Sequence, residues 1–445
     1  MLRIRWFVFC VIVASACLGG RPAAAEQVIA AWRGGGFNCP LSVSVNPTDG
    51  SCWVADYNNN QVVHLAQNGA QLWRGGGFVG PHSVSVNTAD GSCWVAESDN
   101  NRVVHLGASG NQLWAGAFNQ PISVSVNPND GSCWVTDTKN NQVVHLAQNG
   151  AQLWRSAGYP TFNSPFCVSV NPTDNSCWVT DSYNNQVVHL AENGAQLWRS
   201  AGYPTFNQPQ FVSVNAIDSS CWVADTGNNR VVHLAASGTQ LWELGLGIVL
   251  LVSVNAADGS CWATMANGNG GGAAMHFARD GRQLWGGEGV TGLKYPASVS
   301  VNPTDGSCWV GDIGNGQVVH LVVVNPVVLS SAYVTPTSGM GNTTFTWRVK
   351  YWNTDNAPPD QVLVAIWFPT LKRSYWYAMW PLYPSNVNYK GGVVYTFSRR
   401  WLPPGAYAYR FAARQALNWV PLNVYYAYWP SPAGSYRSGP TVSGP

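Results

Sequence analysis

The chain has 445 residues, a formal net charge of +2, and 46% hydrophobic residues. This length exceeds that of an ordinary single domain, so at least two domains are expected. No stretch after the first 25 residues reaches the roughly 18 to 20 uninterrupted apolar residues of a transmembrane helix, so no membrane span is expected.

Residues 1–25 have the pattern of a secretory signal peptide. Arg3 and Arg5 precede an apolar run, and small residues end at Ala25. This order predicts cleavage after Ala25 and a secreted, periplasmic or cell-surface location. An alternative is lipidation at Cys17, because residues 14–17 loosely resemble a lipobox.

Residues 26–325 consist of one repeated unit. Successive Cys-Trp pairs are 41, 40, 44, 44, 40 and 47 residues apart. Each unit has four β-rich runs, and in the first copy the turns between them are Asp49-Gly50, Asn58–Asn60 and Asn68-Gly69. Four strands in about 40 to 45 residues predict a β-propeller blade.

Segments of these repeats resemble NHL-repeat propellers. The stretch 224–232 resembles the polar loop and third strand of that repeat, and 162–165 and 206–209 resemble its lead-in to the innermost strand. Cys-Trp replaces the usual aliphatic-aromatic pair, and a histidine replaces an aliphatic residue. The resemblance implies an all-β propeller.

Counting each strand type predicts seven blades. Cys-Trp strands and histidine-bearing third strands each occur seven times, but fourth strands ending in Trp reach seven only if Trp32 is included. The N-terminal strand around Val28–Trp32 is therefore expected to pair beside the strand that holds His320. This closure removes the exposed sheet edges of an open array.

Seven cysteines, seven histidines and six acids recur at fixed repeat positions. The cysteines are expected to be buried thiols, because equivalent positions on different blades lie too far apart for disulfides. The histidines are expected to pack between blades with hydrogen-bonded rings. The acids, which end the second strand, are expected to cap their own turns by accepting backbone N–H bonds. A carboxylate ring that binds Ca²⁺ or a cationic ligand is the alternative for the acids.

The mouth of the central channel is the natural place for an active site, since propellers of similar appearance include metal-dependent lyases and lactonases. The residues entering the innermost strands are Leu41, His82, Ile122, Phe166, Gln210, Leu250 and Ala297. Only His82 among them has a metal-binding side chain, and no nucleophile–base pair stands out. No metal or cofactor is therefore expected. The sixth unit departs most from the repeat at residues 265–273, as an asymmetric site or as a decayed copy.

Residues 326–445 predict a separate antiparallel sandwich. Aromatic residues alternate along 344–352, 361–368, 392–397 and 406–413. The run 402–411 and the ending 438–442 resemble bacterial immunoglobulin-like domains. This segment carries 10 Lys and Arg against 2 Asp and Glu, whereas residues 26–326 carry 10 against 19. The acidity of the propeller argues against nucleic-acid binding there. Attraction between the two halves is one reading of this asymmetry, and a basic module that meets anionic polymers is the other.

These observations predict an exported, non-catalytic binding or scaffolding protein, expected to be a monomer. Its loop face would hold a protein or polysaccharide partner. The alternative is a metal-dependent lyase or lactonase that uses His82. Candidate ligand-binding residues are His82, Tyr159, Tyr203 and Gln210 in the propeller, and Arg399, Arg400 and Trp401 in the sandwich, where exposed aromatic rings beside cations would stack on sugars.

Overall fold

The structure is a computed structural model of the whole chain. It describes residues 27–443, with gaps at 157–160, 201–204, 267–270, 287–291, 325–327, 337, 341, 353–357, 360, 369, 372, 386–387, 390–392, 401, 404, 417–423 and 430–436. The predicted leader and Cys17 lie outside the described residues. Within the described part, all regular elements are strands apart from five short 3₁₀ turns, and no helix could cross a membrane.

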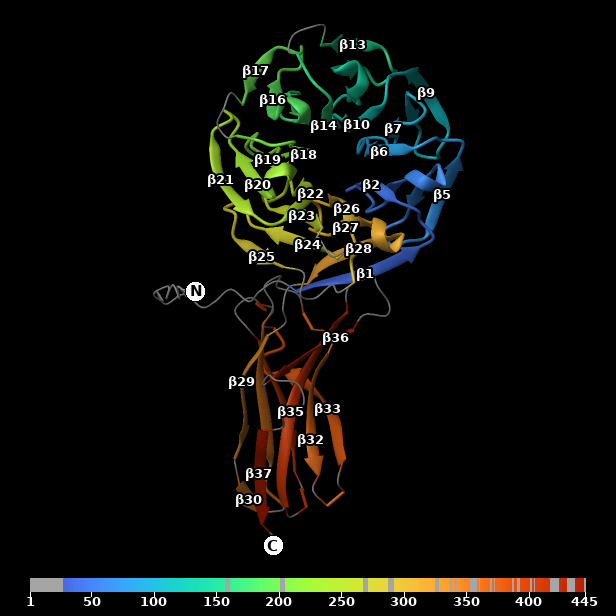
Figure 1. Cartoon of the computed structure of the whole chain (residues 1–445). Helices are drawn as coiled ribbons and strands as arrows, with labels where there is room; N and C mark the ends of the chain where they lie inside the picture. Colours follow the sequence, from blue (N-terminus) through green and yellow to red (C-terminus); the bar gives the residue numbers. More distant parts are fainter. Residues whose placement is uncertain are drawn as a thin grey trace, which may run out of the picture.

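Residues 27–324 form four-stranded antiparallel sheets, of which the described residues contain seven. In each sheet the strand order follows the chain, except that β1 joins the last sheet. Figure 1 shows these sheets arranged in a ring. The first three sheets comprise β2 (Pro40–Val45), β3 (Cys52–Asp56), β4 (Gln61–Leu65) and β5 (Gln71–Gly76); β6 (Pro81–Val86), β7 (Cys93–Glu97), β8 (Arg102–Leu106) and β9 (Gln112–Ala117); and β10 (Pro121–Val126), β11 (Cys133–Asp137), β12 (Gln142–Leu146) and β13 (Gln152–Arg155).

The other four sheets continue in the same order. They comprise β14 (Pro165–Val170), β15 (Cys177–Asp181), β16 (Gln186–Leu190) and β17 (Gln196–Arg199); β18 (Phe211–Val214), β19 (Cys221–Asp225), β20 (Arg230–Leu234) and β21 (Gln240–Gly245); β22 (Ile248–Val254), β23 (Cys261–Ala266), β24 (Gly272–Phe277) and β25 (Gln283–Trp285); and β26 (Pro296–Val301), β27 (Cys308–Asp312), β28 (Gln317–Val324) and β1 (Gln27–Gly35). The 3₁₀ turns are η1 (Tyr57–Asn59), η2 (Thr138–Asn140), η3 (Ser182–Asn184), η4 (Thr226–Asn228) and η5 (Ile313–Asn315).

The N-terminal strand completes the last sheet, which confirms the predicted pairing. β1 runs antiparallel to β28, with Trp32 opposite His320 and Val28 opposite Val323. Sheet β26–β28 would otherwise have only three strands. The two ends of the repeat region are thus joined by backbone hydrogen bonds, which leaves no gap between its first and last strands.

Serines on the innermost strands link each sheet to the next. An innermost strand has only one neighbour in its own sheet, so half of its N–H groups need another acceptor. The Ser42 and Ser44 hydroxyls accept the N–H groups of Val84 and Val86, and Ser300 accepts that of Val45. Equivalent bonds join the other neighbouring inner strands. The repeated Ser-Val-Ser-Val sequence therefore holds the sheets together around the axis.

A Trp–His stack forms the centre of every one of these sheets. Trp53 is fully buried and lies parallel to His64 on the next strand, with ring centroids 4.2 Å apart. In the other six pairs the ring centroids are 4.2 to 4.9 Å apart. The neighbouring cysteines are buried and free, as predicted. Each of these histidines stacks on a tryptophan of its own sheet. Four of the rings also form a hydrogen bond with the backbone of the next sheet, which confirms the expected packing between blades for His105, His145, His189 and His320.

Residues 328–443 form a second, separate set of strands around their own core. They are β29 (Val328–Thr335), β30 (Ser338–Met340), β31 (Phe345–Trp352), β32 (Gln361–Phe368), β33 (Arg373–Pro381), β34 (Val393–Arg399), β35 (Gly405–Ala416), β36 (Val424–Trp429) and β37 (Arg437–Ser443). Alternate residues of β31 and β32, such as Trp347 and Val364, point into one buried cluster. Every described cluster lies within one of the two modules.

Candidate functional site

The innermost strands surround a small cavity at the mouth of the central channel. All seven residues predicted to enter those strands line it: Leu41, His82, Ile122, Phe166, Gln210, Leu250 and Ala297. The cavity has a volume of about 160 Å³. Tyr295 and Ile313 also line it. Sequence reasoning missed these two because they come from the lead-in and η5 turns, outside the inner-strand alignment.

His82 is the one ionisable imidazole of this cavity, and half of its bonding capacity is already used. Its Nδ1 lies 3.0 Å from the Ile122 carbonyl oxygen, which accepts a hydrogen bond from that nitrogen. The ring meets Tyr57 and Phe166 edge-on, at centroid distances of 6.2 Å. Burial lowers the pKa of His82, so the imidazole is neutral near pH 7. Nε2 is then left as a hydrogen-bond acceptor.

Gln210 supplies an amide side chain to the cavity wall, which also contains Ser42, Ser83 and Ser123. Its backbone carbonyl accepts a hydrogen bond from Thr180 Oγ1 at 3.1 Å, which fixes the chain at this point. Near the same mouth, Tyr57 donates a hydrogen bond of 2.7 Å to Asp99, and this bond raises the pKa of Tyr57. The cavity therefore combines a mostly apolar wall with a few polar side chains, His82 and Gln210 among them, that can orient a ligand.

The acids that end the second strands have a structural role, but their carboxylates bond to the upstream lead-in loop and not, as the sequence had predicted, to backbone N–H groups of their own turns. Asp56 accepts the backbone N–H of Asn38 at 2.7 Å, and the side chains of Asn59 and Gln61 at 2.8 and 2.6 Å. It caps no backbone N–H of its own turn. The same upstream bond recurs at Glu97, Asp137, Asp181, Asp225 and Asp312. Each carboxylate thus fastens the lead-in loop to the second strand, which uses up most of its acceptor capacity.

No metal centre is assembled from these repeated residues in the part of the chain that the structure describes. No three His, Cys, Asp or Glu side chains converge there in a way that could hold an ion. Five of the stacked histidines instead place Nε2 at 2.9 to 3.0 Å from a serine hydroxyl of the same sheet. The repeated imidazoles and carboxylates are therefore parts of the scaffold.

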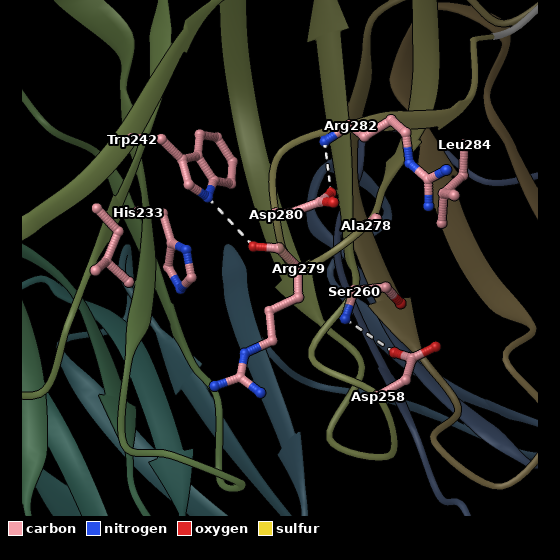
Figure 2. A pocket seen from close by; sticks show the side chains of 10 residues that line it. His233, Trp242, Asp258, Ser260, Ala278, Arg279, Asp280, Arg282 and Leu284 are labelled. Carbon is pink, nitrogen blue, oxygen red and sulfur yellow. Dashed lines mark hydrogen bonds between the residues drawn. The ribbon is translucent and has the colours of Figure 1, made fainter. Parts of the chain in front are cut away.

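A larger pocket lies between sheets β18–β21 and β22–β25 (Figure 2). Its volume is about 590 Å³, and its wall includes Trp242 from β21 on one side and Asp258, Arg279, Asp280 and Arg282 on the other. Trp242 donates a hydrogen bond from Nε1 to the Arg279 carbonyl oxygen at 3.2 Å. Sequence reasoning placed the irregularity of the sixth unit at 265–273 and missed the charged turn at 279–282, which was visible as a departure from the repeat.

Of the remaining predicted site residues, the structure describes only Arg399 and Arg400. Arg399 lies over the rings of Tyr377 and Phe368, at 5.0 and 5.2 Å from their centroids, and bonds to the Tyr377 hydroxyl. Arg400 donates from Nε to the Asn342 carbonyl oxygen at 2.8 Å. Both guanidinium groups are therefore engaged within the C-terminal module. Tyr159, Tyr203 and Trp401 lie outside the described residues.

Comparisons with solved structures support the propeller architecture. A streptogramin B lyase structure superposes with a TM-score of 0.56 at 14% identity, covering 68% of this chain and 100% of that one. A catalytically inactive virginiamycin B lyase from Staphylococcus aureus, solved with quinupristin, gives 0.55 at 15%, covering 67% and 100%. The WD40 repeats of RRP9 give 0.56 at 10%, covering 67% and 99%. At these identities the similarity concerns the fold alone.

Sequence-family comparisons point to the same architecture. The NHL repeat model matches residues 37–65. A second family model, described as outer membrane protein assembly factor BamB, matches residues 58–175 and 139–319. No curated protein sequence matches the chain significantly. Because the two matches to the second model together span more than half of the 445 residues, the chain belongs to this family of β-propeller repeat proteins.

Proposed function

We propose that this protein is an exported, non-catalytic binding or scaffolding protein. In this proposal the repeat region of residues 26–325 is a closed seven-bladed disc whose channel-mouth face holds a protein partner. The matching family's description as an assembly factor supports a scaffolding role. The order of charged, apolar and small residues in 1–25 supports export.

The observation that carries this proposal is the chemistry of the channel-mouth cavity. Most of its wall is apolar, and its polar side chains are suited to orienting a group rather than to activating one. Its volume of about 160 Å³ is close to the roughly 150 Å³ of an apolar cavity that admits benzene. It therefore fits a single aromatic or branched side chain, the type of anchor that dominates protein interfaces.

The C-terminal module, residues 326–445, would space or anchor the disc as an immunoglobulin-like sandwich. Tyr407 donates a hydrogen bond of 2.6 Å to the Pro403 carbonyl oxygen, four residues upstream. A tyrosine that bonds back to the preceding corner is a feature of such sandwiches. The module's excess of 10 basic over 2 acidic residues supports contact with an anionic polymer or with the acidic propeller.

The test uses a substitution, Ala297→Trp, whose side chain fills the cavity in the full-length protein. A random peptide library is panned on the immobilised protein, and the selected peptides are measured against Ala297→Trp and against Ala297→Ser as the matched control. Peptides with an aromatic or aliphatic anchor should bind, and Ala297→Trp should weaken them about thirty-fold, because a buried anchor contributes about 2 kcal/mol or more. Ala297→Ser, which leaves the space open, should bind them nearly unchanged.

Two results would overturn the proposal. One is an absence of selected peptides, or selected peptides that bind Ala297→Trp as well as the parent protein. The other is a stoichiometric divalent ion in the purified protein that is lost in His82→Ala. That second result would favour a metal-dependent lyase or lactonase at the same cavity.

A further inference from the structure

One junction between neighbouring sheets differs from the others in how its outer tryptophan packs. At five junctions the tryptophan of a fourth strand lies flat against the glycine in the next sheet's last turn. A Cβ atom added to that glycine would lie only 1.9 to 2.2 Å from the ring, as at Gly110 beneath Trp73 and Gly150 beneath Trp114. At Gly281 beneath Trp242 the corresponding distance is 3.0 Å. The tryptophan has therefore moved away from the neighbouring turn.

The ring of Trp242 is also turned relative to the inner tryptophan of its own sheet. Trp222 and Trp242 meet at an interplanar angle of 81°, whereas the other six pairs meet at 50 to 56°. In this orientation Trp242 bonds to the Arg279 carbonyl and meets His233 edge-on. The pocket of about 590 Å³ lies at this junction (Figure 2), and its size falls in the range of small-molecule sites.

The turn that faces Trp242 has a composition unlike that of the other repeats. Residues 279–282 read Arg-Asp-Gly-Arg, where the first repeat has Gln-Asn-Gly-Ala at 67–70 and the third has the same at 148–151. Arg279 forms an ion pair with Asp218 of the preceding sheet. Arg282 is exposed and forms no ion pair with another described residue. The turn thus adds two guanidinium groups and a carboxylate to the pocket wall.

Two further side chains of the wall are carboxylates. Asp258 and Asp280 each use one carboxylate oxygen to accept a backbone N–H, from Ser260 at 2.8 Å and from Arg282 at 3.0 Å. Their other oxygens remain available, because each carboxylate can accept several bonds. The wall therefore offers an indole, acceptors from two carboxylates and donors from Arg282, while Arg279 is already paired with Asp218.

We propose that this pocket binds a neutral saccharide. A sugar ring presents an apolar C–H face suited to an aromatic ring, and hydroxyl groups around its edge that both donate and accept hydrogen bonds. Carboxylates and a guanidinium group around an indole match that combination. A strongly anionic ligand would be repelled by Asp258 and Asp280, and a cationic ligand would be repelled by Arg282. The site is built from other residues than the channel-mouth cavity, so it is independent of the function proposed above.

The experiment uses the full-length protein and a panel of maltose, cellobiose, diacetylchitobiose, glucuronic acid and glucosamine, measured by saturation-transfer NMR and titration calorimetry. At least one neutral disaccharide should bind, and Trp242→Leu and Asp280→Asn should each weaken it ten-fold or more. Trp114→Leu, the matched tryptophan at an ordinary junction, should leave binding within two-fold. Asp280→Asn changes one exposed side chain and tests the site if Trp242→Leu does not fold.

Each other outcome overturns the proposal. Binding of none of the neutral sugars excludes a saccharide site of this kind. Tighter binding of glucuronic acid or of glucosamine would assign the pocket to a charged ligand. Neutral-sugar binding that survives Asp280→Asn would place the sugar elsewhere on the protein. By contrast, loss of sugar binding in Trp242→Leu with unchanged peptide binding at the channel mouth is the expected result, and it distinguishes this site from the proposed partner site.

Discussion

The packing of tryptophans on turn glycines gives a direct test of how the sheets are joined. Gly150 and Gly281 occupy the same repeat position and both have φ of +84°, with the same turn hydrogen bond. Alanine at either site incurs about 1–2 kcal/mol for the left-handed backbone conformation. At Gly150 the new methyl group would also lie 2.2 Å from the Trp114 ring, whereas at Gly281 it would lie 3.0 Å from Trp242.

Because of this steric difference, the two otherwise equivalent substitutions should lower the free energy of unfolding by different amounts. Overpacking of this kind costs about 1–3 kcal/mol, so Gly150→Ala should lose about 2–5 kcal/mol in total and Gly281→Ala about 1–2 kcal/mol. In thermal unfolding of the full-length protein, the transition of Gly150→Ala should lie about 2–6 °C below that of Gly281→Ala, since 1 kcal/mol corresponds to about 2 °C in a large domain.

Differential scanning calorimetry and circular dichroism would measure these transitions, with the parent protein as reference. If both variants lost the same stability, the flat packing of Trp114 on Gly150 would contribute nothing, and the contrast drawn with Trp242 would be refuted. A larger loss in Gly281→Ala would refute it equally.

Two further predictions concern buried ionisable groups. Burial lowers the pKa of His233 and His320 to about 4, below that of an unfolded histidine, so the unfolded chain binds more protons between pH 4 and 6.5 and stability should fall as the pH falls through this window. Burial raises the pKa of Asp181 to about 6, which has the opposite effect on stability. Burial also lowers the pKa of five further histidines, so the unfolding temperature should still decrease from pH 7 to pH 4. An increase would contradict this reasoning. Asp137→Ala should cost about 1–3 kcal/mol in urea unfolding, because a lead-in N–H loses its acceptor, and an unchanged midpoint would show that the carboxylate does not fasten the loop.

Much of the fold followed from the sequence because its signals are local or repeated. Asn68-Gly69 marks a turn on its own, and a period of about 40 to 45 residues with four strands leaves few architectures. The pairing of β1 with β28 also followed from the sequence, because the strand that contains Trp32 supplies the fourth strand that the last repeat lacks. The seven residues at the channel mouth followed from the same alignment, since equivalent positions in a ring face one axis.

The tertiary structure decided what depends on contacts between different repeats. Nothing near Asp56 in the sequence shows that its carboxylate bonds to the N–H of Asn38, 18 residues upstream. The engagement of Arg399 with Tyr377 likewise depends on how distant strands pack. The charged residues of the turn at 279–282 can be read in the sequence, but the pocket arises only where that turn meets Trp242 of the preceding sheet. Local propensity and periodicity fix each repeat, whereas the orientation of one side chain against the next sheet is set by close packing across the junction.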